Sequence, residues 1–174
     1  KELDLNWNDM EGDGARAEVD TRAKTRDLLA QAAPDMTGGA DAFRTLRAAE
    51  TWYKFGAIVE ANEEALTPSY IWNVREGRDI QAEDYLAAEA TRTRILRDAM
   101  RFFDHYDVLL LPVASVPPFR NDGGEVMQVG ETNCETIIDY LACTFLISLI
   151  GFPCLSLPAP TCHPALPFGL QLVA

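Results

Sequence analysis

Serine hydroxyls of this chain could attack a carbonyl carbon, and lysine amines could accept the proton that the hydroxyl loses. A nucleophilic hydroxyl needs a base within hydrogen-bonding reach and donors for the oxyanion, which a glycine-rich turn often supplies. None of the serines lies in a Gly-x-Ser-x-Gly segment or a Gly-Ser-Ser-Gly run; they are Ser69, Ser115, Ser148 and Ser156. The lysines fall in polar or helical contexts; they are Lys1, Lys24 and Lys54. The sequence therefore contains no recognisable pair of nucleophile and base.

Histidine and cysteine are also not spaced for a metal site. His105 follows a predicted helix end, and Cys162-His163 lies in a proline-rich segment without a second pair of ligands at zinc spacing. The cysteines have no Cys-x-x-Cys spacing and lie near the C-terminal end: Cys134, Cys143, Cys154 and Cys162. A chain of this size does not need disulfides to fold, so we expect reduced thiols. We predict no metal and no cofactor, and we interpret Asp104 and Asp107 as residues that cap a turn.

The composition excludes several kinds of partner. The chain has 174 residues, and 15 Lys+Arg against 27 Asp+Glu give a net charge of −12. Such a surface repels nucleic-acid phosphates and anionic lipid headgroups. The longest apolar run, residues 141–150, has about half the ~20 residues of a membrane-spanning helix. We expect no nucleic-acid partner, no membrane association and, because no apolar signal-peptide core opens the sequence, a cytoplasmic location.

Periodicity and turn residues predict helices early in the chain and strands late. The expected helices are residues 15–34, 41–65, 68–76, 81–104 and 132–149. The expected strands are residues 108–111, 154–157 and 168–173, with a loop at 112–130 and a proline-rich connection at 158–167. Thr67-Pro68 has the form of a helix start, with Thr as N-cap and Pro at the first position. Two apolar rows in residues 41–65, one through Tyr53 and one through Val59, predict burial on two sides.

These elements predict an α/β fold in which helices pack on part of a mixed β-sheet. Residues 1–107 are expected to be mainly helical, and residues 108–174 to form a strand, helix and strand region. A self-contained α/β domain would alternate strands and helices through its whole length. We therefore expect residues 1–174 to form a single partial domain, a fragment of a larger one.

Three segments resemble the amidase signature hydrolases. Residues 102–112, Phe-Phe-Asp-His-Tyr-Asp-Val-Leu-Leu-Leu-Pro, are similar to that family's "FF..YDVLL.P" segment. Residues 136–141 and 146–158 resemble its "yidw…G.Pa.s.P" stretch, and residues 166–173, Leu-Pro-Phe-Gly-Leu-Gln-Leu-Val, resemble "LPvGLQlvg". Pro160 stands where the family usually has Gly, and Ser148 stands where many members have Asn.

The resemblance implies layers of helices around a mixed sheet and hydrolysis of a carboxamide C–N bond through a serine acyl-enzyme, without cofactor or metal. The family's nucleophilic serine is activated by a lysine through a second serine in its N-terminal half, and no position of this sequence matches that set. The chain thus resembles the C-terminal part of an amidase, whose partners would be the missing N-terminal half and a small amide substrate. By analogy, the residues expected to line the acyl pocket are Val113, Ala114, Ser115, Cys143 and Phe145.

Two other functions remain open at this stage. The chain could be a non-catalytic scaffold or interaction module derived from an amidase, or a protein similar to the related amidotransferase that modifies acylated tRNA. The charge of −12 disfavours direct phosphate contact in the second case. In each case we expect no amide hydrolysis by this chain alone, and association into homo-oligomers through exposed apolar surface.

Overall fold

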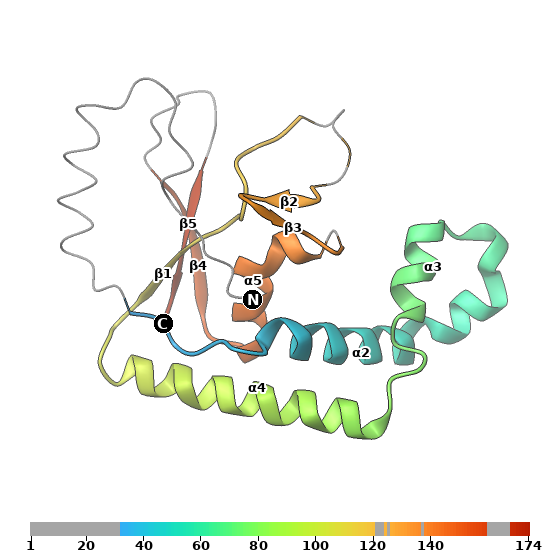
Figure 1. Cartoon of the computed structure of the whole chain (residues 1–174), viewed down its shortest axis with the longest axis horizontal. Coiled ribbons are helices and arrows are strands. Elements are labelled where there is room, and N and C mark those ends of the chain that lie inside the picture. Colours follow the sequence, from blue (N-terminus) through green and yellow to red (C-terminus); the bar gives the residue numbers. More distant parts are fainter. Residues whose placement is uncertain (1–31, 121–123, 125, 137, 160–167) are drawn as a thin grey trace. The chain divides into compact units, whose positions relative to one another are not determined.

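A computed structural model describes residues 32–120, 124, 126–136, 138–159 and 168–174 (Figure 1). Most of the predicted helix at residues 15–34 and most of the connection at 158–167 lie outside these residues. The chain divides into two compact units. We call residues 35–101 the helical unit, and residues 102–174 with 32–34 the strand unit.

The helical unit begins with the helix α2, Gly39–Asn62, which is followed by the single turn η2, Glu63–Ala65. Gly38 has a φ of 76°, a left-handed conformation that glycine adopts at little cost, and α2 starts directly after it. On α2 the predicted burial row through Val59 is confirmed only in part, because Phe55 in that row is 39% exposed. Val59 is fully buried, whereas Tyr53 is 88% exposed. The prediction of burial on two sides is therefore wrong for the row through Tyr53.

The helix α3, Pro68–Arg75, starts as the sequence predicts. The Thr67 hydroxyl accepts the N–H of Tyr70 at 3.4 Å, and Pro68 occupies the first turn, where its missing N–H costs nothing. The chain turns at Gly77, where a Cβ atom would lie 1.9 Å from the carbonyl oxygen of Ala48. This close approach packs the end of α3 against the middle of α2.

The helix α4, Ala82–Phe103, confirms the predicted helix at residues 81–104. Arg94 on this helix donates to the carboxylates of Asp98 at 2.9 Å and Asp35 at 3.1 Å, and to the carbonyl oxygen of Thr37. Ile95 is fully buried. These contacts attach the segment that leads into α2 to the middle of α4.

The strand unit contains the strands β1, Leu109–Pro112, β4, Cys154–Pro158, and β5, Gly169–Val173 (Figure 1). They form a three-stranded sheet in the order β1-β5-β4, and both pairings are antiparallel. β1 and β4 therefore run in the same direction on either side of β5. Helices together with this small sheet confirm the α/β class.

Residues 128–150 differ from their prediction as a loop followed by one long helix. The strands β2, Gln128–Val129, and β3, Thr132–Asn133, form a hairpin; the turn η4, Asp139–Leu141, and the helix α5, Ala142–Ile150, come only afterwards. Gly130 has a φ of 56°, which suits the tight turn between the two strands. The Asp139 carboxylate accepts the N–H groups of Glu135 and Thr136, so these two backbone groups are bonded to a side chain instead of to the carbonyl groups of a helix.

The two faces of the sheet differ in burial. Gln171 and Val173 point to one face and are 5% and 0% exposed. Successive residues of a strand alternate between faces, and residues in register share a face. The other face consequently carries the residues that we call the leucine face: Leu110, Leu155, Leu157, Leu170 and Leu172. Leu110 on β1 is 39% exposed and Leu155 on β4 is 57% exposed, so the described part of the chain has the exposed apolar surface that was expected of it.

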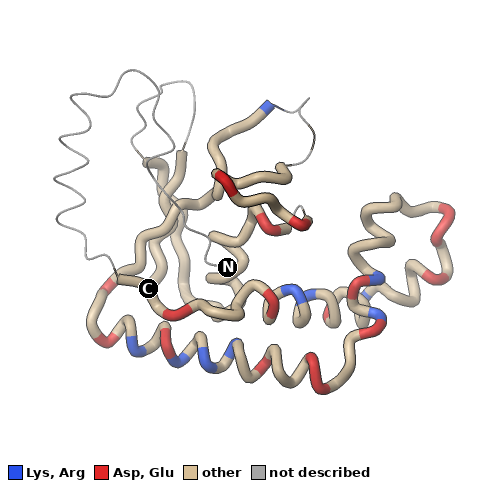
Figure 2. Tube along the Cα trace, in the orientation of Figure 1, with Lys and Arg blue, Asp and Glu red and all other residues tan. Residues whose placement is uncertain are grey.

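Charge is distributed unevenly over the chain. Figure 2 shows Lys, Arg, Asp and Glu along the helices α2 to α4, whereas β1, β4 and β5 carry no charged residue. No helix among the described residues is long and apolar enough to cross a membrane. Polar chemistry on the three-stranded sheet therefore depends on uncharged side chains.

Candidate functional site

The candidate site is built where the chain leaves β1. The N–H of Val113 donates to the carbonyl oxygen of Gly169 at 3.2 Å, so the pairing with β5 continues one residue past the end of β1. Gly169 leaves the space that the Val113 side chain uses, because a Cβ atom at Gly169 would lie 2.6 Å from Val113 Cγ2. The start of the segment 113–115 is thus held against β5.

A hydroxyl and a thiol meet at the end of this segment. The Ser115 hydroxyl donates to Cys143 Sγ at 3.4 Å, and Cys143 lies in the first turn of α5, where it is 7% exposed. Burial raises the pKa of the Cys143 thiol, and the hydrogen bond from Ser115 opposes this only in part. The thiol is therefore protonated at neutral pH, and the pair presents a polar, uncharged wall instead of an activated nucleophile.

Gln171 lies beside this pair, in the middle of β5. Its Nε2 donates to the carbonyl oxygen of Cys143 at 2.7 Å and lies 3.5 Å from that of Pro112, a long contact. Its Oε1 accepts the thiol hydrogen of Cys154 at 3.1 Å. One buried amide thus has partners on α5, β1 and β4. Gln171 is not among the site residues predicted above, although a single polar side chain in the apolar strand Gly-Leu-Gln-Leu-Val was a usable signal.

The structure brings together some of the residues expected to line a pocket. Ser115 and Cys143 are in contact, and Val113 lies against β5 directly before them. Ala114 is exposed. Phe145 is 5% exposed and stands two positions after Cys143 on α5, a spacing that directs the two side chains to different sides of a helix. The role of these residues as an acyl-pocket lining stays a prediction.

The other residues considered for catalysis have local partners. The Ser148 hydroxyl donates to the carbonyl oxygen of Thr144 at 3.3 Å, and Lys54 forms an ion pair with Glu50 at 2.5 Å. Ser69 lies 3.4 Å from the Thr67 hydroxyl, Ser156 stands on β4, and Lys1 and Lys24 lie outside the described residues.

Cysteine, histidine and acidic residues were also considered as metal ligands. Cys134, Cys143 and Cys154 are free thiols, whereas Cys162 and His163 lie outside the described residues. Across the part of the chain that the structure describes, no three His, Cys, Asp or Glu side chains are grouped in a way that could hold a metal ion.

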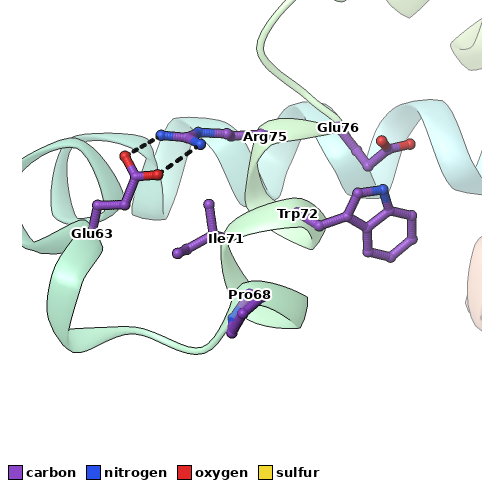
Figure 3. A pocket seen from close by; sticks show the side chains of 6 residues that line it. All are labelled: Glu63, Pro68, Ile71, Trp72, Arg75 and Glu76. Atoms are coloured by element: carbon purple, nitrogen blue, oxygen red, sulfur yellow. Dashed lines mark hydrogen bonds and ion pairs between the residues drawn. The ribbon is translucent and has the colours of Figure 1, made fainter.

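The helical unit has an open pocket of about 530 Å³ (Figure 3). Its lining consists of Glu63, Pro68, Ile71, Trp72, Arg75 and Glu76. Arg75 and Glu63 form a two-pronged ion pair, with distances of 3.1 and 2.5 Å, and hydrogen bonding to Glu63 raises the pKa of Arg75. The charges of Arg75 and Glu63 thus neutralise each other, and Glu76 is the remaining charged residue of the lining.

Comparison with known proteins places the chain in a family. The family model described as Amidase matches residues 27–174. The chain belongs to the amidase family. The resemblance to amidase signature hydrolases found in the sequence is thereby confirmed.

Curated relatives match about half of this amidase-family chain. A fatty acid amide hydrolase of Arabidopsis thaliana is 30% identical over 101 residues, which are 55% of this chain and 16% of that protein. A glutamyl-tRNA(Gln) amidotransferase subunit of Geotalea daltonii is 38% identical over 91 residues, 51% of this chain and 17% of that protein. The matched region therefore spans about a sixth of the length of these relatives.

Solved structures show the same fold. The crystal structure of an amidase has a TM-score of 0.74 and 23% identity, and the match covers 89% of this chain and 38% of that one. A bacterial aryl acylamidase of the amidase signature family has a TM-score of 0.65 and 22% identity, with 80% of this chain and 30% of that chain covered. The chain thus has the fold of part of these enzymes.

Proposed function

We propose that this chain is the C-terminal part of an amidase that hydrolyses a carboxamide C–N bond. The family match over residues 27–174 is the observation that carries the proposal, and the name of the relative from Arabidopsis thaliana, a fatty acid amide hydrolase, agrees with a carboxamide as substrate. In this chemistry a serine oxygen attacks the carbonyl carbon and the amine leaves with a proton, after which water hydrolyses the acyl-enzyme. The serine and its base belong to sequence outside this chain, and no cofactor takes part.

The proposal also includes a partner for this chain, the N-terminal half of the same enzyme. The leucine face supports this part of it. Leu155 and Leu157 of β4 are 57% and 41% exposed, and Leu110 of β1 is 39% exposed. Among the described strands β1 and β4 are the edges of the sheet. An apolar face with open edges is a surface that a complete α/β enzyme covers with further strands or helices.

Two other functions are weighed against this one. The matches to glutamyl-tRNA(Gln) amidotransferase subunits favour a related amidotransferase as the second candidate, in which the same amide chemistry serves acylated tRNA. The net charge of −12 argues against phosphate contact by this part of it. A non-catalytic scaffold is the third candidate, and it would not require a catalytic half.

The decisive experiment compares the chain alone with the chain joined to its upstream coding sequence. The isolated 174-residue chain should hydrolyse none of a panel of aryl and alkyl amides, and the joined protein, with an upstream Ser-Ser-Lys set, should hydrolyse at least one. Replacing the upstream nucleophilic serine by alanine should abolish this turnover. Hydrolysis by the isolated chain that survives repeated purification, or a joined protein inactive on every amide, would contradict the proposal.

The leucine face has its own test. We expect the isolated chain to bind a hydrophobic dye and to self-associate in sedimentation, and the N-terminal half to suppress both. Leu155→Glu should reduce dye binding, whereas Ser156→Glu, its neighbour on the opposite face of the strand, should change it little. A dye-silent monomer with a cooperative melt would show that the chain closes its own core.

A further inference from the structure

Gln171 is a polar side chain in a place where burial is costly unless its groups are bonded. It is 5% exposed and stands between apolar neighbours on the central strand. An amide without partners in such a position would destabilise the fold, so its contacts carry information about what it holds. They join positions 28 and 59 residues apart in the sequence.

The two carbonyl groups that Gln171 contacts both lead to the candidate lining. The Pro112 carbonyl oxygen ends β1, and the next residues are those of the segment 113–115. The Cys143 carbonyl oxygen belongs to the residue whose thiol accepts the Ser115 hydroxyl. Gln171 is therefore bonded to the backbone of Cys143 and to the backbone three residues before Ser115.

The residues next to Gln171 on the same face of the sheet also contact the segment 113–115 or the Gln171 amide. Gly169 stands two positions before Gln171 and leaves room for the Val113 side chain. At the other side of Gln171, the Cys154 thiol donates to Oε1, which satisfies the acceptor end of the amide. Nε2 and Oε1 of Gln171 thus both have hydrogen-bond partners, and one orientation of the side chain satisfies all of them together.

We propose that Gln171 is a positioning residue for the acyl-lining segment: its amide holds the Pro112 and Cys143 carbonyl groups and thereby sets the Ser115 hydroxyl against the Cys143 thiol. That this wall faces an acyl group rests on the proposed function. The positioning itself rests on the hydrogen bonds. A packing role alone would require the volume of Gln171 but not its amide.

The test measures the Cys143 thiol by the Raman band of its S–H bond, whose frequency depends on hydrogen bonding. Cys143 is made the sole thiol by replacing Cys134, Cys154 and Cys162 with serine, which keeps a donor to Gln171 Oε1. Ser115→Ala should shift the band in this chain. In the Gln171→Met background, which keeps the length of the side chain and removes its amide, Ser115→Ala should leave the band unchanged.

Gln128→Met is the matched control, because Gln128 is an exposed glutamine on β2. In that background the shift caused by Ser115→Ala should be retained. An equal shift in the Gln171→Met background would overturn the proposal. It would show that the Ser115–Cys143 contact forms without the amide.

A second measurement needs no variant and covers the case in which Gln171→Met fails to fold. The Nε2 hydrogens of Gln171 should exchange with solvent at least about tenfold more slowly than those of Gln128, because buried and bonded hydrogens exchange only through opening. Equal exchange rates would overturn the proposal. Neither readout depends on hydrolysis, so a failure here and a failure of the proposed amidase activity are distinguishable.

Discussion

Gly169→Ala tests whether Val113 is held against β5 as the structure describes. The new Cβ would lie 2.6 Å from Val113 Cγ2, too close for carbon atoms in contact. Overpacking of this kind costs about 1–3 kcal/mol. The exchange of glycine for alanine in a strand returns roughly 0.5–1 kcal/mol. We therefore expect Gly169→Ala to lower the free energy of unfolding by up to about 2.5 kcal/mol, with a central value of about 1 kcal/mol.

The origin of that loss is tested by adding Val113→Ala. Val113 is half-buried, so its truncation alone should cost about 1 kcal/mol, from ~0.8 kcal/mol per fully buried methylene. In the double variant the clash is gone, and Gly169→Ala should become neutral or slightly stabilising. The two changes should therefore be coupled by roughly 1–2 kcal/mol.

Urea unfolding at a protein concentration below the onset of self-association gives the free energies. Ser156→Ala, on the exposed strand β4, is the control and should stay within about 0.5 kcal/mol of the parent chain. Additive effects of Gly169→Ala and Val113→Ala would refute the contact between them and, with it, the positioning of the segment 113–115 by β5.

Three further predictions concern single groups. Gly77→Ala should lower the free energy of unfolding by about 3 kcal/mol or more, because its Cβ would meet a backbone atom, Ala48 O, at 1.9 Å; a loss below ~1 kcal/mol in urea would contradict the packing of α3 on α2. Hydrogen bonds from the Thr37 side chain and N–H lower the pKa of Asp35, so NMR titration should find it below the ordinary aspartate value, with Thr37→Ala raising it. The small stability gain from Asp35 is present at neutral pH and is lost as the pH falls through the lowered pKa. Burial raises the pKa of Cys143, so at neutral pH its alkylation should require unfolding and accelerate with urea, and rapid labelling of the folded chain would count against this.

Local patterns in the sequence were sufficient for several elements. Thr67-Pro68 predicted the start of α3, and the apolar period of residues 81–104 predicted α4, because capping and helical periodicity act within a few residues. The strands β4 and β5 were predicted from short apolar runs. The family was recognisable for a similar reason, since its three segments are contiguous stretches of sequence.

Other features could not be predicted because they depend on which segments meet. A helix was predicted to begin at residue 132, but residues 132–133 form β3. The reason is that the chain turns back at Gly130 and pairs β3 with β2. Tyr53 had the spacing of a buried residue, yet it is 88% exposed. Periodicity shows that a row of side chains is apolar, and only the packed structure decides whether anything covers it.

The candidate site shows the same division. The sequence by itself determined the family, the apolar strands that frame the site and the absence of a recognisable nucleophile and base from this chain. Only the tertiary structure placed Gln171 beside the backbone of Pro112 and Cys143, because its contacts join residues 28 and 59 positions apart. Periodicity and capping operate over one or two turns of chain. The pairing of a buried amide is decided by strand register and by the packing of α5 on β5, which are properties of the whole unit.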